Sequence, residues 1–221
     1  MERATHERER AEAVRLPPLG LEGILALPAG AGAVVAFAHG SGSSRLSPRN
    51  ARVAAALRAH GLGTLVFDLL TDEEAEDRAN VFDIPLLAER LRLATRWLAA
   101  DARTRGLPVG YFGASTGAAA ALVAAASEPE IGAVVSRGGR PDLAGASLPR
   151  VRAPTLLIVG GDDPVVLELN REALAELRCE KELVVVPGAS HLFEEPGTLE
   201  AVTVLASRWL ARHLLHEEER P

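Results

Sequence analysis

The chain has 221 residues, of which 48% are hydrophobic and 24% are charged. This composition is typical of a soluble globular protein, and the length suits one domain with a sizeable core. The formal net charge of −6 and the lack of any lysine-rich tract argue against a nucleic-acid-binding surface. The only cysteine, Cys179, excludes an internal disulfide and favours a reducing compartment.

Residues 1–11 are densely charged, so we expect a flexible leader followed by a single domain over residues 12–221. The leader lacks the apolar core of a signal peptide, and no uninterrupted apolar run is long enough to span a bilayer. These features predict a cytoplasmic protein that binds neither a membrane nor a nucleic acid.

After the leader, short apolar runs alternate with segments of helical periodicity. The runs predicted to be strands are residues 21–27, 33–38, 63–67, 108–112, 133–136, 155–159 and 183–186. The predicted helices are residues 50–60, 85–105, 118–126, 169–177 and 196–215, with Pro196 in the first turn of the last one. Residues 70–80 are acidic and polar, and we expect them to form a loop.

This alternation predicts a three-layer α/β/α sandwich with a mostly parallel sheet that is covered by helices on both faces. The connection between residues 136 and 155 is short and rich in Gly and Pro. The fold is therefore expected to lack a large cap domain and to leave its site open.

The segment Gly113-Ala-Ser-Thr-Gly117 lies between a predicted strand and an alanine-rich predicted helix. Glycines two residues either side of Ser115 suit a sharp strand-to-helix turn, because larger side chains would collide there. Such a turn strains the serine backbone and exposes its hydroxyl at the carboxyl end of the sheet. We therefore predict that Ser115 is a nucleophile.

Two further reactive groups follow later predicted strands, Asp163 with its neighbour Asp162 and then His191. The order Ser, Asp, His along the chain is the order that accompanies a nucleophile elbow. A serine hydroxyl needs an imidazole to remove its proton, and the imidazole needs a carboxylate to fix its tautomer. We predict the catalytic triad Ser115, Asp163 and His191. Asp163 is preferred because it directly precedes Pro164, and Asp162 stays the alternative.

The loop that begins at His39 and Gly40 is built of small residues and follows a predicted buried strand. Preorganised backbone amides in such a loop stabilise the negative charge that develops on a carbonyl oxygen. We predict that the N–H groups of Ser41 and Thr116 form this oxyanion hole. His39 is expected to brace the loop and, with Gly40 and Gly42, to line the substrate site. A phosphate-cradling loop or a plain turn is the alternative.

Arg137 and Arg140 stand just after the predicted strand at residues 133–136. Guanidinium groups pair well with carboxylates, so Arg137, or its neighbour Arg140, is a candidate for holding an anionic group of a substrate. The alternative is a surface arginine paired with an acidic neighbour. The histidines are scattered and no metal-ligand spacing is present, so we expect neither a metal nor another cofactor.

These motifs together resemble the α/β-hydrolase superfamily. Because little chain lies between the predicted strand at residues 133–136 and the loop that carries Asp163, the sequence resembles the dienelactone-hydrolase-like branch of that superfamily over nearly all of residues 12–216. The resemblance implies a serine hydrolase that cleaves a small-molecule carboxylic ester through an acyl-enzyme. Dienelactone hydrolases proper use a cysteine nucleophile, whereas this chain has Ser115, so their substrate is not carried over.

Other functions are compatible with the same motifs. Acyl transfer and peptide hydrolysis use the same triad, and a non-catalytic member of the fold would bind a ligand in the pocket. A nucleotide-binding domain with residues 113–117 as a phosphate loop is a further class, but the lysine of a P-loop is missing.

Overall fold

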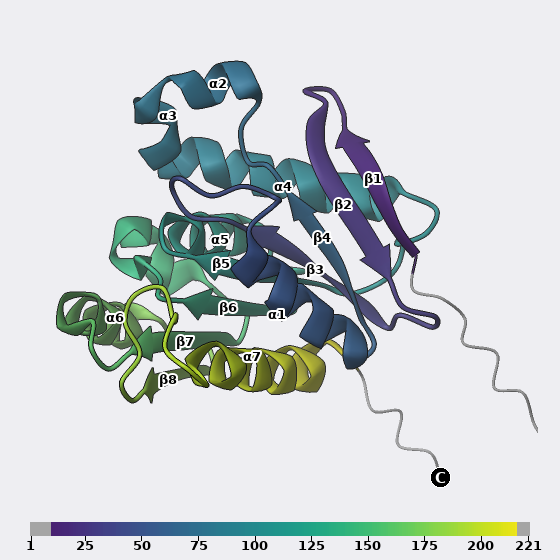
Figure 1. The fold of residues 1–221 in the computed structure, drawn as a ribbon. Coiled ribbons are helices and arrows are strands. Elements are labelled where there is room, and N and C mark those ends of the chain that lie inside the picture. Colours follow the sequence, from purple (N-terminus) through teal and green to yellow (C-terminus); the bar gives the residue numbers. More distant parts are fainter. Residues whose placement is uncertain (1–9, 216–221) are drawn as a thin grey trace, which may run out of the picture.

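The computed structural model describes residues 10–215, which form one eight-stranded sheet between two layers of helices (Figure 1). The strand order is β1-β2-β4-β3-β5-β6-β7-β8; β1 and β2 pair antiparallel, β2 pairs antiparallel with β4, and the other pairings are parallel. The strands are β1 (Arg10–Leu16), β2 (Leu21–Leu27), β3 (Ala33–Ala38), β4 (Leu62–Phe67), β5 (Val109–Ala114), β6 (Ala133–Arg137), β7 (Thr155–Gly160) and β8 (Lys181–Val186). The predicted mostly parallel α/β sandwich is thus confirmed.

The helices lie on both faces of this sheet. They are α1 (Pro48–Ala59), α2 (Asp72–Glu76), α3 (Arg78–Phe82), α4 (Ile84–Ala100), α5 (Thr116–Ser127), α6 (Pro164–Glu176), α7 (Thr198–Leu214) and the 3₁₀ segment η1 (Pro141–Arg150). One hydrophobic core lies between the sheet and α4, α5, η1 and α6, and a second lies beneath α1 and α7. Because apolar side chains point to both faces, the central strands β3, β4 and β6 are buried along their whole length.

The chain enters the sheet earlier than the sequence predicts. Strand β1 begins at Arg10, so residues 10 and 11 belong to a strand and not to a leader; residues 1–9 lie outside the described part of the chain. β1 pairs along its full length with β2. An edge strand tolerates polar side chains on its open side, so the start of β1 is charged. For this reason its first residues were assigned to the leader from the sequence.

The predicted loop at residues 70–80 is wrong, because this segment forms the two short helices α2 and α3. Thr71 and Glu74 make a capping box: the Thr71 hydroxyl accepts from the Glu74 N–H at 3.2 Å, and the Glu74 carboxylate accepts from the Thr71 N–H at 3.0 Å. Arg90 of α4 forms an ion pair with Glu74. The capping box and the ion pair therefore stabilise α2, although this helix has no buried residues.

Three predicted helix boundaries are also shifted. α4 ends at Ala100 rather than near residue 105, and Asp101 caps it in an extended conformation. α6 begins at Pro164, where the Asp163 carboxylate accepts from the Val166 N–H at 3.4 Å. α7 begins at Thr198, so Pro196 lies before the helix and not in its first turn; Gly197 precedes the helix in the left-handed conformation.

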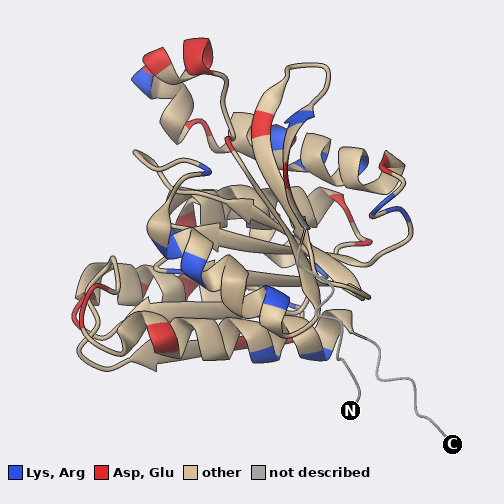
Figure 2. Ribbon diagram, turned by 45° about the vertical axis from the view of Figure 1, so that its right-hand side comes forward, with Lys and Arg blue, Asp and Glu red and all other residues tan. Residues whose placement is uncertain are grey.

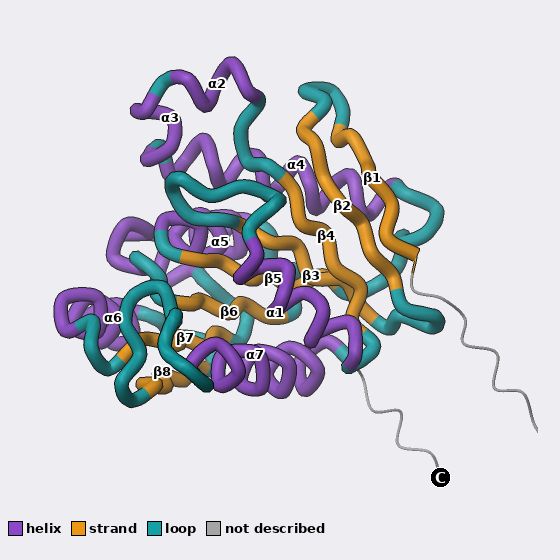
Figure 3. Tube along the Cα trace, in the orientation of Figure 1, coloured by secondary structure: helices purple, strands orange, loops and turns teal. Residues whose placement is uncertain are grey.

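The carboxyl ends of the parallel strands lie together at the left of Figure 1, on the side of α2 and α3. In Figure 3 the loops that follow β3 and β8 lie at this same edge of the sheet. Only the η1 segment connects β6 to β7, and no large cap covers the edge among residues 10–215. Figure 2 shows positive and negative residues interspersed along the ribbon. Asp72, Glu73 and Glu74 make the first turn of α2 acidic. None of the described helices combines the length and apolar character needed to cross a membrane.

Candidate active site

Ser115 lies on a strained turn between β5 and α5. Its backbone has φ 50° and ψ −123°, a combination that L-residues rarely adopt and that costs about 1–3 kcal/mol. The turn is tight: a Cβ added to Gly113 would lie 2.5 Å from the Cα of Ala118, and one added to Gly117 would overlap the carbonyl oxygen of Ala38. The two glycines therefore allow the chain to double back, and the Ser115 side chain is only half-buried.

Asp163 and His191 meet although 28 residues separate them. The His191 Nδ1 lies 2.7 Å from the Asp163 Oδ2, and the other carboxylate oxygen caps α6. An anionic carboxylate is favoured at this helix N-terminus by the backbone dipoles. Asp162 is exposed, and its backbone N–H donates to the Ala189 carbonyl at 3.0 Å. Of the two candidate acids, the structure brings Asp163 to His191.

The loop that carries His191 is fixed on both sides of the histidine. Before it, the Ser190 N–H donates to the Glu195 carboxylate at 3.0 Å. The Ser190 side chain, and after it this N–H, lower the pKa of Glu195. After the histidine, Phe193 is fully buried in the left-handed conformation, at φ 55°. The loop also passes so close to the end of β7 that a side chain on Gly160 would overlap the Ala189 carbonyl oxygen. The histidine therefore stands on a rigid support.

The end of β6 and the residues directly after it lie against both the Ser115 turn and the His191 loop. The Ser115 N–H donates to the Arg137 carbonyl at 3.3 Å, and the Ser115 carbonyl accepts from the Arg140 N–H at 3.1 Å. A Cβ on Gly138 would lie 3.0 Å from the His191 carbonyl oxygen and 3.7 Å from its Cε1. Both predicted reactive groups thus lie against this one segment, at the carboxyl edge of the sheet.

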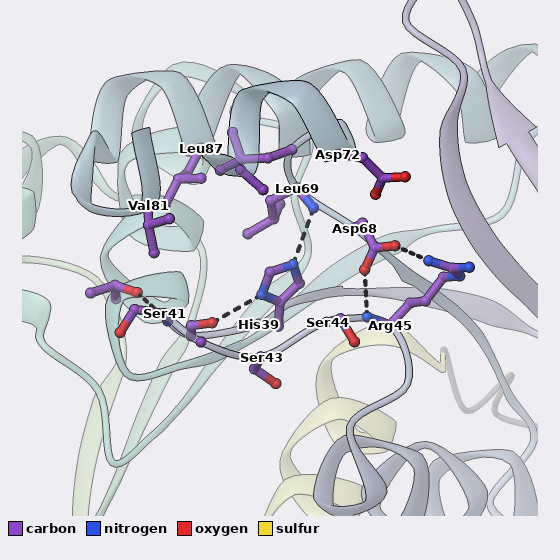
Figure 4. Close-up of a pocket in the computed structure, with 15 residues that line it drawn as sticks. His39, Ser41, Ser43, Ser44, Arg45, Asp68, Leu69, Asp72, Val81 and Leu87 are labelled. Atoms are coloured by element: carbon purple, nitrogen blue, oxygen red, sulfur yellow. Dashed lines mark hydrogen bonds and ion pairs between the residues drawn. The ribbon is translucent and has the colours of Figure 1, made fainter. Parts of the chain in front are cut away.

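His39 holds the loop after β3 against the end of β4. Its Nδ1 lies 3.0 Å from the Gly40 carbonyl oxygen, which requires a proton on Nδ1. Its Nε2 then accepts from the Leu69 N–H at 3.2 Å (Figure 4). Burial lowers the pKa of His39, against the opposing effects of the Gly40 carbonyl and the Asp68 charge, and so favours the neutral ring that both hydrogen bonds need.

Of the two predicted oxyanion donors, the Ser41 amide already has a partner. The Ser41 N–H donates to the Thr116 hydroxyl at 3.0 Å. The Thr116 N–H lies in the first turn of α5, where a helix offers no acceptor for backbone amides. A substrate oxygen would therefore meet the Thr116 amide directly and would have to share the Ser41 amide with the Thr116 hydroxyl.

A cavity of about 290 Å³ opens beside these amides (Figure 4). Its polar wall is the loop from His39 to Arg45, with Thr116, and includes the predicted lining residues Gly40 and Gly42. Its apolar wall includes Leu69, Val81 and Leu87. The apolar residues come from the β4 end and from the α3–α4 region. The sequence indicated that residues 70–80 could wall one side of the site, but because they read as a polar loop it did not predict an apolar wall.

Arg137 and Arg140 differ sharply in their surroundings. Arg140 forms a two-point ion pair with Asp142, at 2.8 Å from Nε and 2.7 Å from Nη2. Arg140 is therefore an arginine paired with an acidic neighbour, which was the alternative to substrate binding. Arg137 is 7% exposed, does not line the 290 Å³ cavity, and has no acidic partner among residues 10–215. Within the same part of the chain, no group of three potential metal ligands from His, Cys, Asp and Glu is present.

The strained elbow, the Asp163–His191 pair and the open parallel sheet define an α/β-hydrolase fold with a serine at the elbow. Residues 21–208 match the Dienelactone hydrolase family, and the chain belongs to that family. The crystal structure of a dienelactone hydrolase from Anabaena variabilis ATCC 29413 is 57% identical, with a TM-score of 0.89 over 94% of this chain and 98% of that one. Together, the family and this structure support a hydrolase.

Other relatives show the fold or carry different names. Est1E from Butyrivibrio proteoclasticus has a TM-score of 0.76 at 16% identity, covering 92% of this chain and 98% of Est1E, and so shows the fold alone. A Mycobacterium tuberculosis protein (strain ATCC 25618 / H37Rv) named "Putative phosphoribosyl transferase" is 62% identical over 199 residues. That match covers 89% of this chain but 45% of the relative, so the chain spans less than half of that protein's length.

Proposed function

We propose that this protein is a serine hydrolase that cleaves carboxylic esters through an acyl-enzyme. Ser115 Oγ attacks the ester carbonyl while His191 Nε2 takes the hydroxyl proton. The same proton is then given to the departing alkoxide, and the alcohol leaves. In the second half-reaction water attacks the acyl-enzyme, His191 again removes and returns the proton, and the carboxylic acid is released.

The observation that carries this proposal is the 2.7 Å contact between His191 Nδ1 and Asp163. A carboxylate acceptor places the imidazole proton on Nδ1, so Nε2 keeps the lone pair that a general base needs. The carboxylate also stabilises the imidazolium that forms during attack. An exposed loop histidine without this partner would have neither property.

The negative charge of the tetrahedral intermediate needs donors that are already in place. The Thr116 amide is one, aided by the positive end of the α5 dipole. The Ser41 amide is the other, and its bond to the Thr116 hydroxyl holds the loop against the start of α5. His39 contributes by fixing the same loop from the opposite side.

The proposed substrate is a small ester. The cavity beside Thr116 measures about 290 Å³, a volume at the small end of ligand sites, and its apolar wall of Leu69, Val81 and Leu87 suits a short hydrocarbon group. A lactone is a cyclic ester and would be opened by the same steps, which agrees with the name of the Anabaena relative. Transfer of the acyl group to an alcohol or amine is the competing reaction for the same triad.

A panel of p-nitrophenyl esters of increasing acyl length tests the proposal. We expect rapid turnover of short esters by the wild type and a loss of at least about 10³-fold in the Ser115→Ala variant. Adding an alcohol acceptor separates the two reactions, because a transferase forms the new ester whereas a hydrolase releases mainly acid. Turnover of the panel at more than a tenth of the wild-type rate by Ser115→Ala would place the nucleophile elsewhere.

A further inference from the structure

Asn170 is a polar residue in the interior of the protein, on the buried side of α6. Its Nδ2 donates to two carbonyl oxygens, that of Val166 at 2.7 Å and that of Gly139 at 2.9 Å. The bond to Val166 stays within α6, whereas Gly139 belongs to the short segment between β6 and η1. The side-chain amide therefore links a helix to a segment that lies 31 residues earlier in the chain.

The stability of α6 gives little reason for an asparagine at this position. Asparagine is a poor helix former, because its amide competes with the backbone for hydrogen bonds. The buried Oδ1 of Asn170 has no hydrogen-bond partner among residues 10–215, and an unpaired buried acceptor costs free energy. A leucine of similar volume would avoid both costs. What it could not supply is the bond to Gly139, the one contact of this amide that leaves the helix.

The helix end of this link carries the acid of the triad. Asp163 caps α6 by accepting from the Val166 N–H at 3.4 Å, and its other carboxylate oxygen lies 2.7 Å from His191 Nδ1. Val166 is thus held at its N–H by Asp163 and at its carbonyl by Asn170. Asn170 follows Asp163 by two helical turns, so both lie on the same side of α6. Asn170 therefore anchors the turn from which the acid reaches the histidine.

The other end of the link is the segment of residues 137–140, which contacts the nucleophile and the base. Both backbone polar groups of Ser115 are bonded to this segment, its N–H at 3.3 Å and its carbonyl at 3.1 Å. A Cβ on Gly138 would lie 3.0 Å from the His191 carbonyl oxygen, so the segment also packs against the histidine loop. A displacement of Gly139 would therefore move the backbone that supports Ser115 and the backbone that supports His191.

We propose that Asn170 is a positioning residue of the triad, whose bond to the Gly139 carbonyl keeps Asp163 in register with Ser115 and His191. Asn170 is fully buried and does not line the 290 Å³ cavity, so it acts through the backbone of its neighbours and not on the substrate. A displacement of reacting groups by about 1 Å costs on the order of 10²-fold in rate, and the loss of a link between two elements permits such a displacement. This inference rests on the proposed serine-hydrolase chemistry and adds a residue that aligns it.

Two substitutions remove the link, and a third is the matched control. Asn170→Leu fills the space and loses both Nδ2 bonds. Asn170→Ser leaves a hydroxyl that can donate to the Val166 carbonyl within the helix but is too short to reach Gly139. The control is Thr95→Val in α4, because Thr95 is also buried, donates to the carbonyl of Leu91 four residues earlier at 3.1 Å, and has a second buried partner in a tyrosine hydroxyl.

The readouts are kcat and KM for p-nitrophenyl acetate and the rate constant for labelling Ser115 with a fluorophosphonate, all measured well below the Tm of each variant. We expect kcat and the labelling rate to fall at least about 30-fold in both Asn170 variants, because the triad is misaligned. KM should stay within roughly threefold of the wild type, because Asn170 does not touch substrate. Thr95→Val should leave all three values within roughly threefold of the wild type, even where it lowers Tm as much as Asn170→Leu does.

The outcomes separate this inference from the proposed function. Losses of kcat and labelling rate in the Asn170 variants no larger than those in Thr95→Val would overturn the inference and leave ester hydrolysis intact. A loss in Asn170→Leu that is absent from Asn170→Ser would also overturn it, because the bond within the helix would then suffice. Slower labelling of Asn170→Leu, in a protein that turns over no ester, would retain the positioning role and reject the esterase. A wild type that neither hydrolyses esters nor reacts with the fluorophosphonate would reject both. If Asn170→Leu does not fold, Asn170→Ser supplies the same readouts.

Discussion

Replacing Ser115 with glycine should stabilise the fold while removing activity, in contrast to replacement with alanine. Ser115 has φ 50° and ψ −123°, a conformation that glycine adopts freely and that costs other residues about 1–3 kcal/mol. Glycine gives back about 0.5–1 kcal/mol through the greater freedom of its unfolded chain. The side chain is only half-buried, so little packing is lost. The net gain should be about 1 kcal/mol, whereas Ser115→Ala keeps the strain.

Thermal unfolding measures this difference. In a chain of this size, about 1 kcal/mol raises Tm by roughly 2–4 °C. We therefore expect Ser115→Gly to unfold a few degrees above both the wild type and Ser115→Ala, with both variants inactive on p-nitrophenyl esters. A Tm of Ser115→Gly at or below that of Ser115→Ala would refute the claim that this turn stores strain in order to present the hydroxyl.

Three further predictions follow from the site. Asp163→Asn should lower kcat by about 10⁴-fold, whereas Asp162→Asn should change it less than about tenfold; the opposite ranking in the ester assay would shift the acid by one residue. Gly117→Ala should cost at least about 3 kcal/mol in urea unfolding, because its Cβ would overlap the Ala38 carbonyl oxygen; unchanged stability would mean that the turn relaxes. Burial lowers the pKa of His39, so the unfolded chain takes up its proton first and stability falls as the pH drops below about 6.5. Urea unfolding at about pH 7.5 and 5.5 should therefore lose less stability in His39→Gln than in the wild type, and equal losses would contradict this.

The sequence predicted the structure best where a local pattern is compatible with only one conformation. Continuously apolar runs such as 33–38 became buried parallel strands, because only a sheet covered on both faces accommodates them. The glycines around Ser115 indicated a sharp turn before any coordinates, since a Cβ at Gly113 or Gly117 has no room. Helix boundaries were less predictable where adjacent residues can each begin the helix. Pro196 was expected to begin α7, but the helix begins at Thr198 and Gly197 precedes it.

Features that depend on distant contacts could not be read from the sequence. The acidic segment 70–80 carries no apolar periodicity, yet the Thr71–Glu74 capping box and the Arg90 ion pair make it helical. The capping-box spacing was the signal that would have revealed α2. Arg137 and Arg140 look equivalent in the sequence, and only the fold buries one and pairs the other with Asp142.

The central claim is that Ser115 is a nucleophile activated by His191, and active-site labelling tests it most directly. The folded wild-type protein is treated with a fluorophosphonate, and the adduct is counted by intact mass and located by peptide mapping. We predict one adduct per chain, on Ser115, formed much more slowly in His191→Ala and absent from Ser115→Ala. The absence of an adduct on folded wild-type protein, or an adduct on a different residue, would contradict the account.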